Sequence, residues 1–258
     1  MTILKELYQY REMIRSLIHR DIRGRYKGSV LGFLWTFINP LMQLIVYTIV
    51  FSSIMRMGID KYYLFLFVAL IPWIFFSSSL IVGANCIIDN VNLVTKIYFP
   101  REVLPISTVT AGFINMLYSF LILLPVVLLT GDHISLIAWL FLPLIAITEY
   151  FIVLGLTLVF SAITVYLRDV AHILGIVTMA WQFLTPVMYP IDLVPEKYMG
   201  LFMLNPMTPV TIAFRDILYY GKIPELMTIG HTMLFAVALT IVGFVSFGYL
   251  KKGFAEEI

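Results

Sequence analysis

The sequence predicts an all-α polytopic membrane protein with six transmembrane helices. Hydrophobic residues make up 61% of the 258 positions and charged residues 12%, and the mean hydropathy is +0.96. A soluble domain carries about 25% charged residues. The apolar runs reach about 20 residues, the length a helix needs to cross the hydrocarbon of a bilayer, and lack the short alternating segments of an outer-membrane barrel. Basic residues also divide unevenly between the segments that join these runs, which predicts an orientation.

Residues 1–27 are predicted to form a cytoplasmic interfacial helix and its connector. With seven Lys or Arg and no uninterrupted apolar core, they do not resemble a cleavable signal peptide, so we expect the N-terminus to be retained. Apolar residues recur at helical spacing on one side of 3–19, opposite charged residues: Ile3, Leu4, Leu7, Tyr10, Ile14, Leu17 and Ile18 against Lys5, Glu12, Arg15 and His19. This pattern predicts a helix on the inner membrane surface, either as an anchor alone or also as a contact for a cytoplasmic subunit. Gly24 and Gly28 let the chain turn into the bilayer.

Six spans are predicted, at 31–55, 62–84, 104–129, 136–165, 171–189 and 227–250. An even number places both termini on one side of the membrane. If that side is the cytoplasm, the inner segments hold 12 Lys or Arg and the outer segments 5. The positive-inside rule therefore places both termini in the cytoplasm, with 251–258 as a cytoplasmic tail. We expect a multi-pass protein of the cytoplasmic (inner) membrane.

The segment 190–226 is too apolar for a solvated loop, yet five prolines interrupt it: Pro190, Pro195, Pro206, Pro209 and Pro224. Irregular backbone within lipid must be shielded by protein or line a wet cavity, so short re-entrant helices fit this segment. The alternative is a pair of interfacial helices that cap the bundle. No internal repeat is visible, which disfavours a secondary transporter built from inverted repeats.

Residues for catalysis or metal binding are not grouped in this sequence. The lone Cys86 excludes an internal disulfide, and histidines 19, 133, 172 and 231 have no metal-ligand spacing. The phosphate-binding loop G-x-x-x-x-G-K-[ST] does not occur, because Gly221-Lys222 is followed by Ile223. No nucleophile elbow or acidic pair lies at a membrane boundary. We expect no catalytic residue, metal or cofactor in this chain and no nucleic-acid partner, so that nucleotide chemistry belongs to another subunit.

Four segments carry a resemblance to a known family. Residues 20–41 read RDIRGRYKGSVLGFLWTFINPL, 96–105 read KIYFPREVLP, 166–170 read YLRDV and 185–190 read TPVMYP. Together they resemble the membrane subunit of ABC-2 type polysaccharide exporters, the permeases for O-antigen, teichoic acid and capsule-like glycans, over essentially the whole chain. The resemblance implies an ABC-2 (type V exporter) fold that forms a homodimer. It also implies two copies of a separate P-loop ATPase, which binds Mg-ATP, and a lipid-linked glycan and membrane lipids as further partners.

By the same resemblance, 1–258 is one transmembrane domain, with spans one to five in 31–189, outer gate helices in 190–226 and span six in 227–250. A coupling helix that contacts the ATPase is expected within 85–99; the alternative is an ordinary inside loop. The residues expected to couple are Asn85, Asp89, Asn90, Asn92, Lys96, Tyr98 and Arg101. The residues expected at the outer gate are Pro190, Pro195, Pro206, Pro209 and Arg215.

A lipid-linked glycan presents flat C–H faces and hydroxyl groups. Aromatic rings stack on such faces without fixing one register, and amide side chains hydrogen-bond the hydroxyls. The residues predicted to line the path are Phe33, Trp35, Phe37, Asn39, Gln43, Trp73, Asn115, Trp181, Gln182, Phe183 and Tyr189. Spans one and five line the lumen by resemblance, which favours Phe33, Phe37, Trp181 and Phe183. Any of these aromatic rings could instead face lipid, anchor the interface or pack in the core.

Glu149 is the carboxylate deep in a predicted span, where a charge costs about 2.5 to 3.5 kcal/mol on insertion scales. It is either a neutral or hydrogen-bonded structural carboxyl or the proton relay of a proton-coupled transporter. The sequence predicts the permease subunit of an ATP-driven exporter of a lipid-linked polysaccharide. The alternatives are an ABC-2 exporter of drugs or lipids and an ion-coupled secondary transporter.

Overall fold

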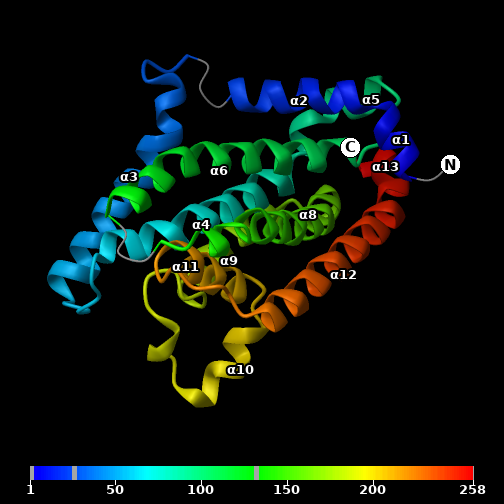
Figure 1. The fold of residues 1–258 in the computed structure, drawn as a ribbon. Helices are drawn as coiled ribbons and strands as arrows, with labels where there is room; N and C mark the ends of the chain where they lie inside the picture. Colours follow the sequence, from blue (N-terminus) through cyan, green and yellow to red (C-terminus); the bar gives the residue numbers. More distant parts are fainter. Residues whose placement is uncertain (1–2, 25–27, 131–133, 258) are drawn as a thin grey trace.

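A computed structural model describes residues 3–24, 28–130 and 134–257, and every regular element in these ranges is helical (Figure 1). This confirms the predicted all-α class. Four stretches lie outside the described residues: 1–2, 25–27 of the predicted connector, 131–133 and Ile258 of the predicted tail. The histidine at 133 is among them.

The helices in chain order are α1 (Ile3–Gln9), α2 (Arg11–Gly24), α3 (Trp35–Thr48), α4 (Tyr62–Asn85), α5 (Val91–Lys96), α6 (Val103–Thr130), α7 (Leu136–Trp139), α8 (Leu142–Tyr166), α9 (Asp169–Phe183), α10 (Glu196–Leu204), α11 (Met207–Leu218), α12 (Leu226–Leu250) and α13 (Phe254–Glu257). A 3₁₀ turn at Gly32–Leu34 precedes α3, and a π-helical turn at Ile49–Ile54 extends it. Further 3₁₀ turns occur at Ile88–Asn90, Ile191–Leu193 and Lys251–Gly253.

Five helical segments of the described chain are long and apolar enough to cross a membrane: Gly32–Ile54, Tyr62–Asn85, Val103–Thr130, Leu136–Tyr166 and Leu226–Gly253. They coincide with the predicted spans 31–55, 62–84, 104–129, 136–165 and 227–250. Helix α4 is the centre of the bundle, because it is apolar on every side and packs against α3, α6, α8, α9 and α11.

The predicted span at 171–189 is not confirmed as a full-length span. Helix α9 has 15 residues, and such a helix rises about 22 Å, less than the roughly 30 Å of hydrocarbon. It ends at Phe183, three residues before Pro186, which has no N–H for a helical hydrogen bond and disfavours a helical conformation in the residue before it.

The N-terminal amphipathic helix predicted at 3–19 is two helices, α1 and α2, which meet at Tyr10. The Tyr10 hydroxyl donates to the carbonyl oxygen of Tyr98 at 3.4 Å. The apolar side of α2 is used within the chain, since α2 packs along α6, Leu17 is buried, and Met13 and Ile14 pack against the core. Figure 1 shows α2 running alongside α6.

The segment 190–226 contains the two short helices α10 and α11. Pro190, Pro195 and Pro206 each occupy the position before a helical turn or helix, and Pro209 lies in the first turn of α11, where a missing N–H costs no hydrogen bond. Helix α11 is largely buried and contacts α4 and α8, whereas α10 has no buried residue. The two helices therefore differ in environment, and their re-entry into the membrane stays a prediction.

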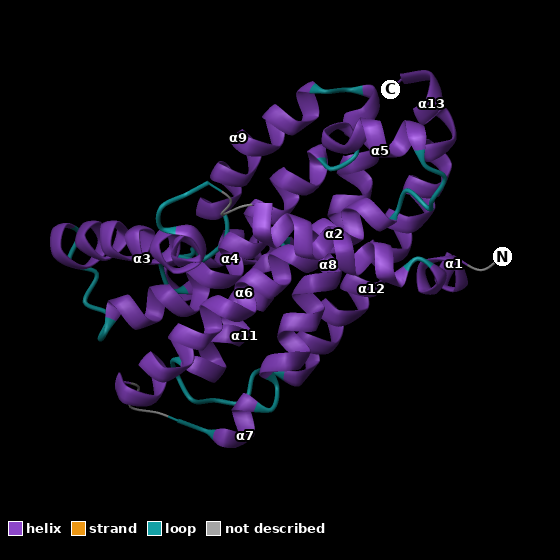
Figure 2. Cartoon of the chain, turned by 90° about the horizontal axis from the view of Figure 1, so that it is seen from above, coloured by secondary structure: helices purple, strands orange, loops and turns teal. Residues whose placement is uncertain are grey.

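The bundle has two distinct ends. Helices α1, α5 and α13 gather at one end, while α3 lies at the other, as both views show (Figures 1 and 2). The described part of the chain therefore begins and ends near the loop that joins α4 to α6. At that end α4 and α6 are linked by the short helix α5, and halfway along both helices α3 covers a cavity.

Candidate transport path and coupling segment

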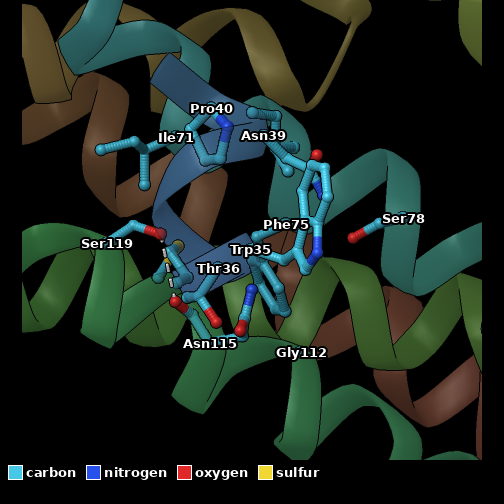
Figure 3. Close-up of a pocket in the computed structure, with 12 residues that line it drawn as sticks. Trp35, Thr36, Asn39, Pro40, Ile71, Phe75, Ser78, Gly112, Asn115 and Ser119 are labelled. Carbon is cyan, nitrogen blue, oxygen red and sulfur yellow. Dashed lines mark hydrogen bonds between the residues drawn. The ribbon is translucent and has the colours of Figure 1, made fainter. Parts of the chain in front are cut away.

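A cavity of about 360 Å³ lies where the first turns of α3 meet the middle of α4 and α6. Twelve residues line it: Trp35, Thr36, Asn39 and Pro40 of α3, Ile71, Ile74, Phe75 and Ser78 of α4, and Gly112, Asn115, Met116 and Ser119 of α6. Figure 3 shows Trp35 and Phe75 at this cavity, between the three helices. Gly112 lets α6 approach α4 closely beside the cavity, since a Cβ on it would lie 2.2 Å from the Ser79 hydroxyl oxygen.

The cavity combines rings with hydrogen-bonding groups. Trp35 Nε1 donates to the Ser29 hydroxyl at 2.9 Å, which fixes the indole plane, and the Ser119 hydroxyl donates to the Asn115 carbonyl at 3.2 Å. Rings beside amides and hydroxyls suit a ligand that has apolar C–H faces and hydroxyl groups. Three residues predicted for the path, Trp35, Asn39 and Asn115, meet here from two helices.

The other predicted path residues lie outside this cavity. Phe33 contacts Phe37 and Tyr118 edge to face, with ring centroids 5.3 and 5.2 Å apart. Trp73 and Trp181 both pack on the ring of Phe76 inside the bundle, with ring centroids 5.2 and 5.0 Å from it. Gln43 and Phe183 are exposed, and Gln182 and Tyr189 are partly buried. Their assignment to a path stays a prediction.

A short helix, α5, lies within 85–99, where a coupling helix was predicted, in the loop between α4 and α6; its contact with an ATPase stays a prediction. A 3₁₀ turn and α5 fill this loop. Four of the predicted contact residues, Asp89, Asn92, Lys96 and Tyr98, are exposed, and Tyr98 is the most exposed at 94%. Although Asp89 is exposed, it borders a cavity beside α2 and α6, and partial burial raises the pKa of its carboxyl.

The other three residues predicted to contact the ATPase form hydrogen bonds within this chain. Asn90 accepts from Arg20 Nη1 at 2.8 Å and donates to the carbonyl oxygen of Cys86 at 2.8 Å, so it joins α2 to the end of α4. Asn85 Nδ2 donates to the Ile81 carbonyl within its own helix at 3.4 Å. Arg101 Nη1 donates to the Lys251 carbonyl at 2.7 Å.

Sequence reasoning missed a cluster that joins the residues directly before α6 to the C-terminal residues. Lys251 Nζ lies 2.6 Å from the carboxylate of Glu102, which is 1% exposed. Phe254 is buried beneath Arg101, and the Tyr166 hydroxyl donates to the Leu250 carbonyl at 2.7 Å. The available signal was an acidic residue, Glu102, between apolar runs, with two lysines directly after the last span.

Arg215, predicted at the outer gate, is buried next to the turn that follows α9. Its guanidinium donates to the carbonyl oxygens of Pro186, Val187 and Tyr189. Asn205, which sequence reasoning missed, accepts from Trp181 Nε1 at 2.9 Å and donates to the Leu184 carbonyl at 3.1 Å. Side chains of α9, α11 and the α10–α11 junction thus hold this turn together.

Glu149 is fully buried in α8, and neither carboxyl oxygen has a hydrogen-bond partner among the described residues. Its role as a structural carboxyl or a proton relay stays open. The described part of the chain also has no group of three or more His, Cys, Asp or Glu side chains placed to hold a metal ion.

Five segments able to cross a membrane, three of which enclose a cavity lined by polar and apolar side chains, define a polytopic helical membrane protein. The chain belongs to the ABC-2 type transporter family, which matches residues 12–219. It is 35% identical over 258 residues, 99% of each chain, to the O-antigen export system permease protein RfbA of Myxococcus xanthus.

Two further relatives extend the likeness. An O-antigen export system permease protein RfbA of Klebsiella pneumoniae is 32% identical over 247 residues, 95% of this chain and 94% of the relative. The polysialic acid transport protein KpsM of Escherichia coli is 24% identical over 238 residues, 89% of this chain and 90% of the relative. The family resemblance seen in four sequence segments is confirmed.

Proposed function

We propose that this chain is the transmembrane permease subunit of an ATP-driven exporter of a lipid-linked polysaccharide across the cytoplasmic membrane. The observation that carries the proposal is the full-length likeness to a relative named as an O-antigen export permease. A glycan of O-antigen type is favoured over one of teichoic acid type, because the curated relatives act on O-antigen and polysialic acid. The family favours this function over an ion-coupled secondary transporter.

The proposed assembly is a homodimer with two copies of a separate P-loop ATPase that binds Mg-ATP, and both termini lie in the cytoplasm. The exposed residues of α5 and its flanks form the docking surface for the ATPase. A groove of about 780 Å³ adjoins them, between α1, the segment 94–101 and the last lysines. The groove offers a partner a concave surface beside α5. Protein interfaces depend on such complementary shapes.

The chain suggests how the partner's motion reaches the path. Helix α5 is joined through short turns to both α4 and α6, and the middles of these two helices form most of the cavity wall. A displacement of α5 therefore moves two walls of the cavity against α3. Trp35 and Phe75 then offer rings to the sugar faces, while Asn39 and Asn115 offer amides to the hydroxyls.

The test is purification of the tagged chain from its native membrane, with its lipids, followed by assay of ATP hydrolysis. We expect a P-loop ATPase to co-purify in equal amount and the native lipid-linked glycan to stimulate hydrolysis. The chain alone should neither bind nor hydrolyse ATP. Recovery of the chain without an ATPase, with transport driven by a proton gradient, would overturn the proposal.

An Asp89→Asn variant tests the docking surface within the same experiment. The amide keeps the size of the side chain and removes its charge, so export should fall while hydrolysis and membrane abundance persist. Asp60→Asn is the matched control, because it makes the same change at an exposed aspartate between the π-helical turn and α4, away from α5. Equal export by both variants would contradict the assigned role of Asp89.

A further inference from the structure

The turn from 184 to 189 is irregular backbone buried in the bundle. It follows the short helix α9 and, after the bond from the Leu184 N–H to the Ala180 carbonyl, is no longer helical, yet Thr185, Pro186, Val187 and Met188 are all buried. A buried carbonyl without a partner is costly, and within a membrane protein no bulk water supplies one. Other elements must therefore supply donors to this turn.

Besides Asn205, which donates to the Leu184 carbonyl, two side chains supply donors. Arg215 of α11 donates to the carbonyl oxygens of Pro186, Val187 and Tyr189, the last at 3.2 Å. The Tyr62 hydroxyl at the start of α4 donates to the Met188 carbonyl at 2.7 Å. Four successive carbonyls of one turn are thus held by side chains from two other helices.

Arg215 also joins α11 to α4. It is 3% exposed, its Nε donates to the Phe65 carbonyl at 3.4 Å, and its guanidinium carbon lies 3.7 Å from the centroid of the Phe65 ring. No carboxylate of the described residues forms an ion pair with it. Carbonyl dipoles and an aromatic face therefore compensate the charge, which requires the planar, five-donor fork of arginine.

We propose that Arg215 and Tyr62 form a latch that holds the turn 184–189 in place and closes the outer end of the transport path. They act as positioning residues, because they fix the backbone of the turn. This inference rests on the proposed function, and it adds to it a named closing device.

The division of the bonds between helices explains why the latch can open. The bonds from Tyr62 and to the Phe65 carbonyl depend on the first turn of α4, whereas the other Arg215 bonds join α11 to the turn. The opposite end of α4 continues into α5, so a shift of α4 driven from α5 changes the latch geometry directly.

The test measures leakage through the purified chain in liposomes that contain fluorescently labelled maltotetraose, without ATP or ATPase. Wild-type protein should retain the label. The Tyr62→Phe variant removes one hydrogen bond to the closed state and should leak about fivefold faster, and Arg215→Gln removes several and should leak more than about tenfold faster. Tyr63→Phe is the matched control, because Tyr63 is the exposed neighbour of Tyr62 on α4.

Melting temperature and a conservative variant separate a latch from a general loss of structure. Arg215→Lys keeps the charge without the fork, so its leakage should lie between wild type and Arg215→Gln. If the Arg215 variants do not accumulate in the membrane, the leakage rate of Tyr62→Phe alone tests the latch. Retention of the label by Tyr62→Phe, or leakage only in proportion to a lowered melting temperature, overturns the latch.

The leak assay also separates this inference from the proposed function. It needs neither the ATPase nor the native glycan, so a wild-type protein that fails to export in the presence of an ATPase would contradict the exporter and leave the latch result standing. If the protein exports its glycan but every latch variant still retains the label, the latch is contradicted and the proposed function is not.

Discussion

Single residues fix the start of α6 to the C-terminal segment that follows α12. The Glu102 carboxylate is buried, and Lys251, with a side chain 31% exposed, supplies the opposite charge at 2.6 Å. Arg101 and Tyr166 bond the carbonyls of Lys251 and Leu250, so three side chains from α8 and the start of α6 hold the end of α12. The residues after the last span are therefore part of the packed structure.

The residue-scale prediction is that Lys251→Met destabilises the protein by about 1 to 3 kcal/mol. It leaves the Glu102 carboxylate buried and unpaired, and the partial exposure of Lys251 keeps the loss below the 3 to 5 kcal/mol typical of a broken buried pair. Thermal unfolding of the purified chain in detergent measures this loss of stability.

The matched control is Lys252→Met, because Lys252 is exposed and its ammonium lies 5.9 Å from the centroid of the Tyr249 ring. The double variant Glu102→Gln with Lys251→Met should recover part of the loss, since no charge is then left buried. Equal stability of the two lysine variants would show that the ion pair contributes nothing.

At the scale of elements, α8 and α12 cross at a contact between glycines. A Cβ at Gly243 would lie 2.6 Å from the Gly155 carbonyl oxygen, and one at Gly155 would lie 2.8 Å from the backbone of Leu239. The Thr240 hydroxyl donates across the contact to the Phe151 carbonyl at 2.8 Å. Small residues let the backbones approach closely, which is the main source of packing energy between helices in a membrane.

We expect Gly243→Ala to destabilise the protein by about 1 to 3 kcal/mol, because the added methyl group meets backbone that cannot rotate away. Gly248→Ala is the control on the same helix: nothing lies within 4 Å of its Cβ position. Alanine is the better helix former, so the control should be neutral or slightly more stable. The comparison is made by thermal unfolding, and equal loss in both variants would contradict the glycine contact.

On the scale of the whole molecule, both ends of the described chain lie beside the α4–α6 loop. The turn 184–189 packs against the opposite end of α4. The prediction is that Tyr98 faces the cytoplasm and Tyr198 the outside. Single cysteines at these exposed positions, 94% and 48% exposed, should react oppositely with a membrane-impermeant maleimide. Tyr198→Cys should label in intact spheroplasts and Tyr98→Cys only in inverted vesicles.

The native cysteine does not interfere with this measurement. Cys86 is buried, and burial raises the pKa of its thiol, so it stays protonated and unreactive. Labelling of Tyr98→Cys in spheroplasts would reverse the orientation derived from basic residues.

Sequence patterns predicted five of the crossing segments closely, because long apolar runs and their ends are local properties. They also located α5 between two spans and the prolines that start α10 and α11. They did not predict the short α9 or the division of the N-terminal helix at Tyr10. Of the path residues, Trp35, Asn39 and Asn115 meet at one cavity, whereas Trp181 bonds Asn205 and packs on Phe76.

The sequence by itself determined the class of protein, the crossing segments and the family, since hydropathy, charge bias and motif order need no contacts. Tertiary structure alone decided which polar residues act together. Arg215 and Tyr62 lie 153 positions apart and Glu102 and Lys251 lie 149 apart, yet each pair converges on one site. Side-chain partners over such separations are fixed by how helices pack, which residue spacing along the chain does not encode.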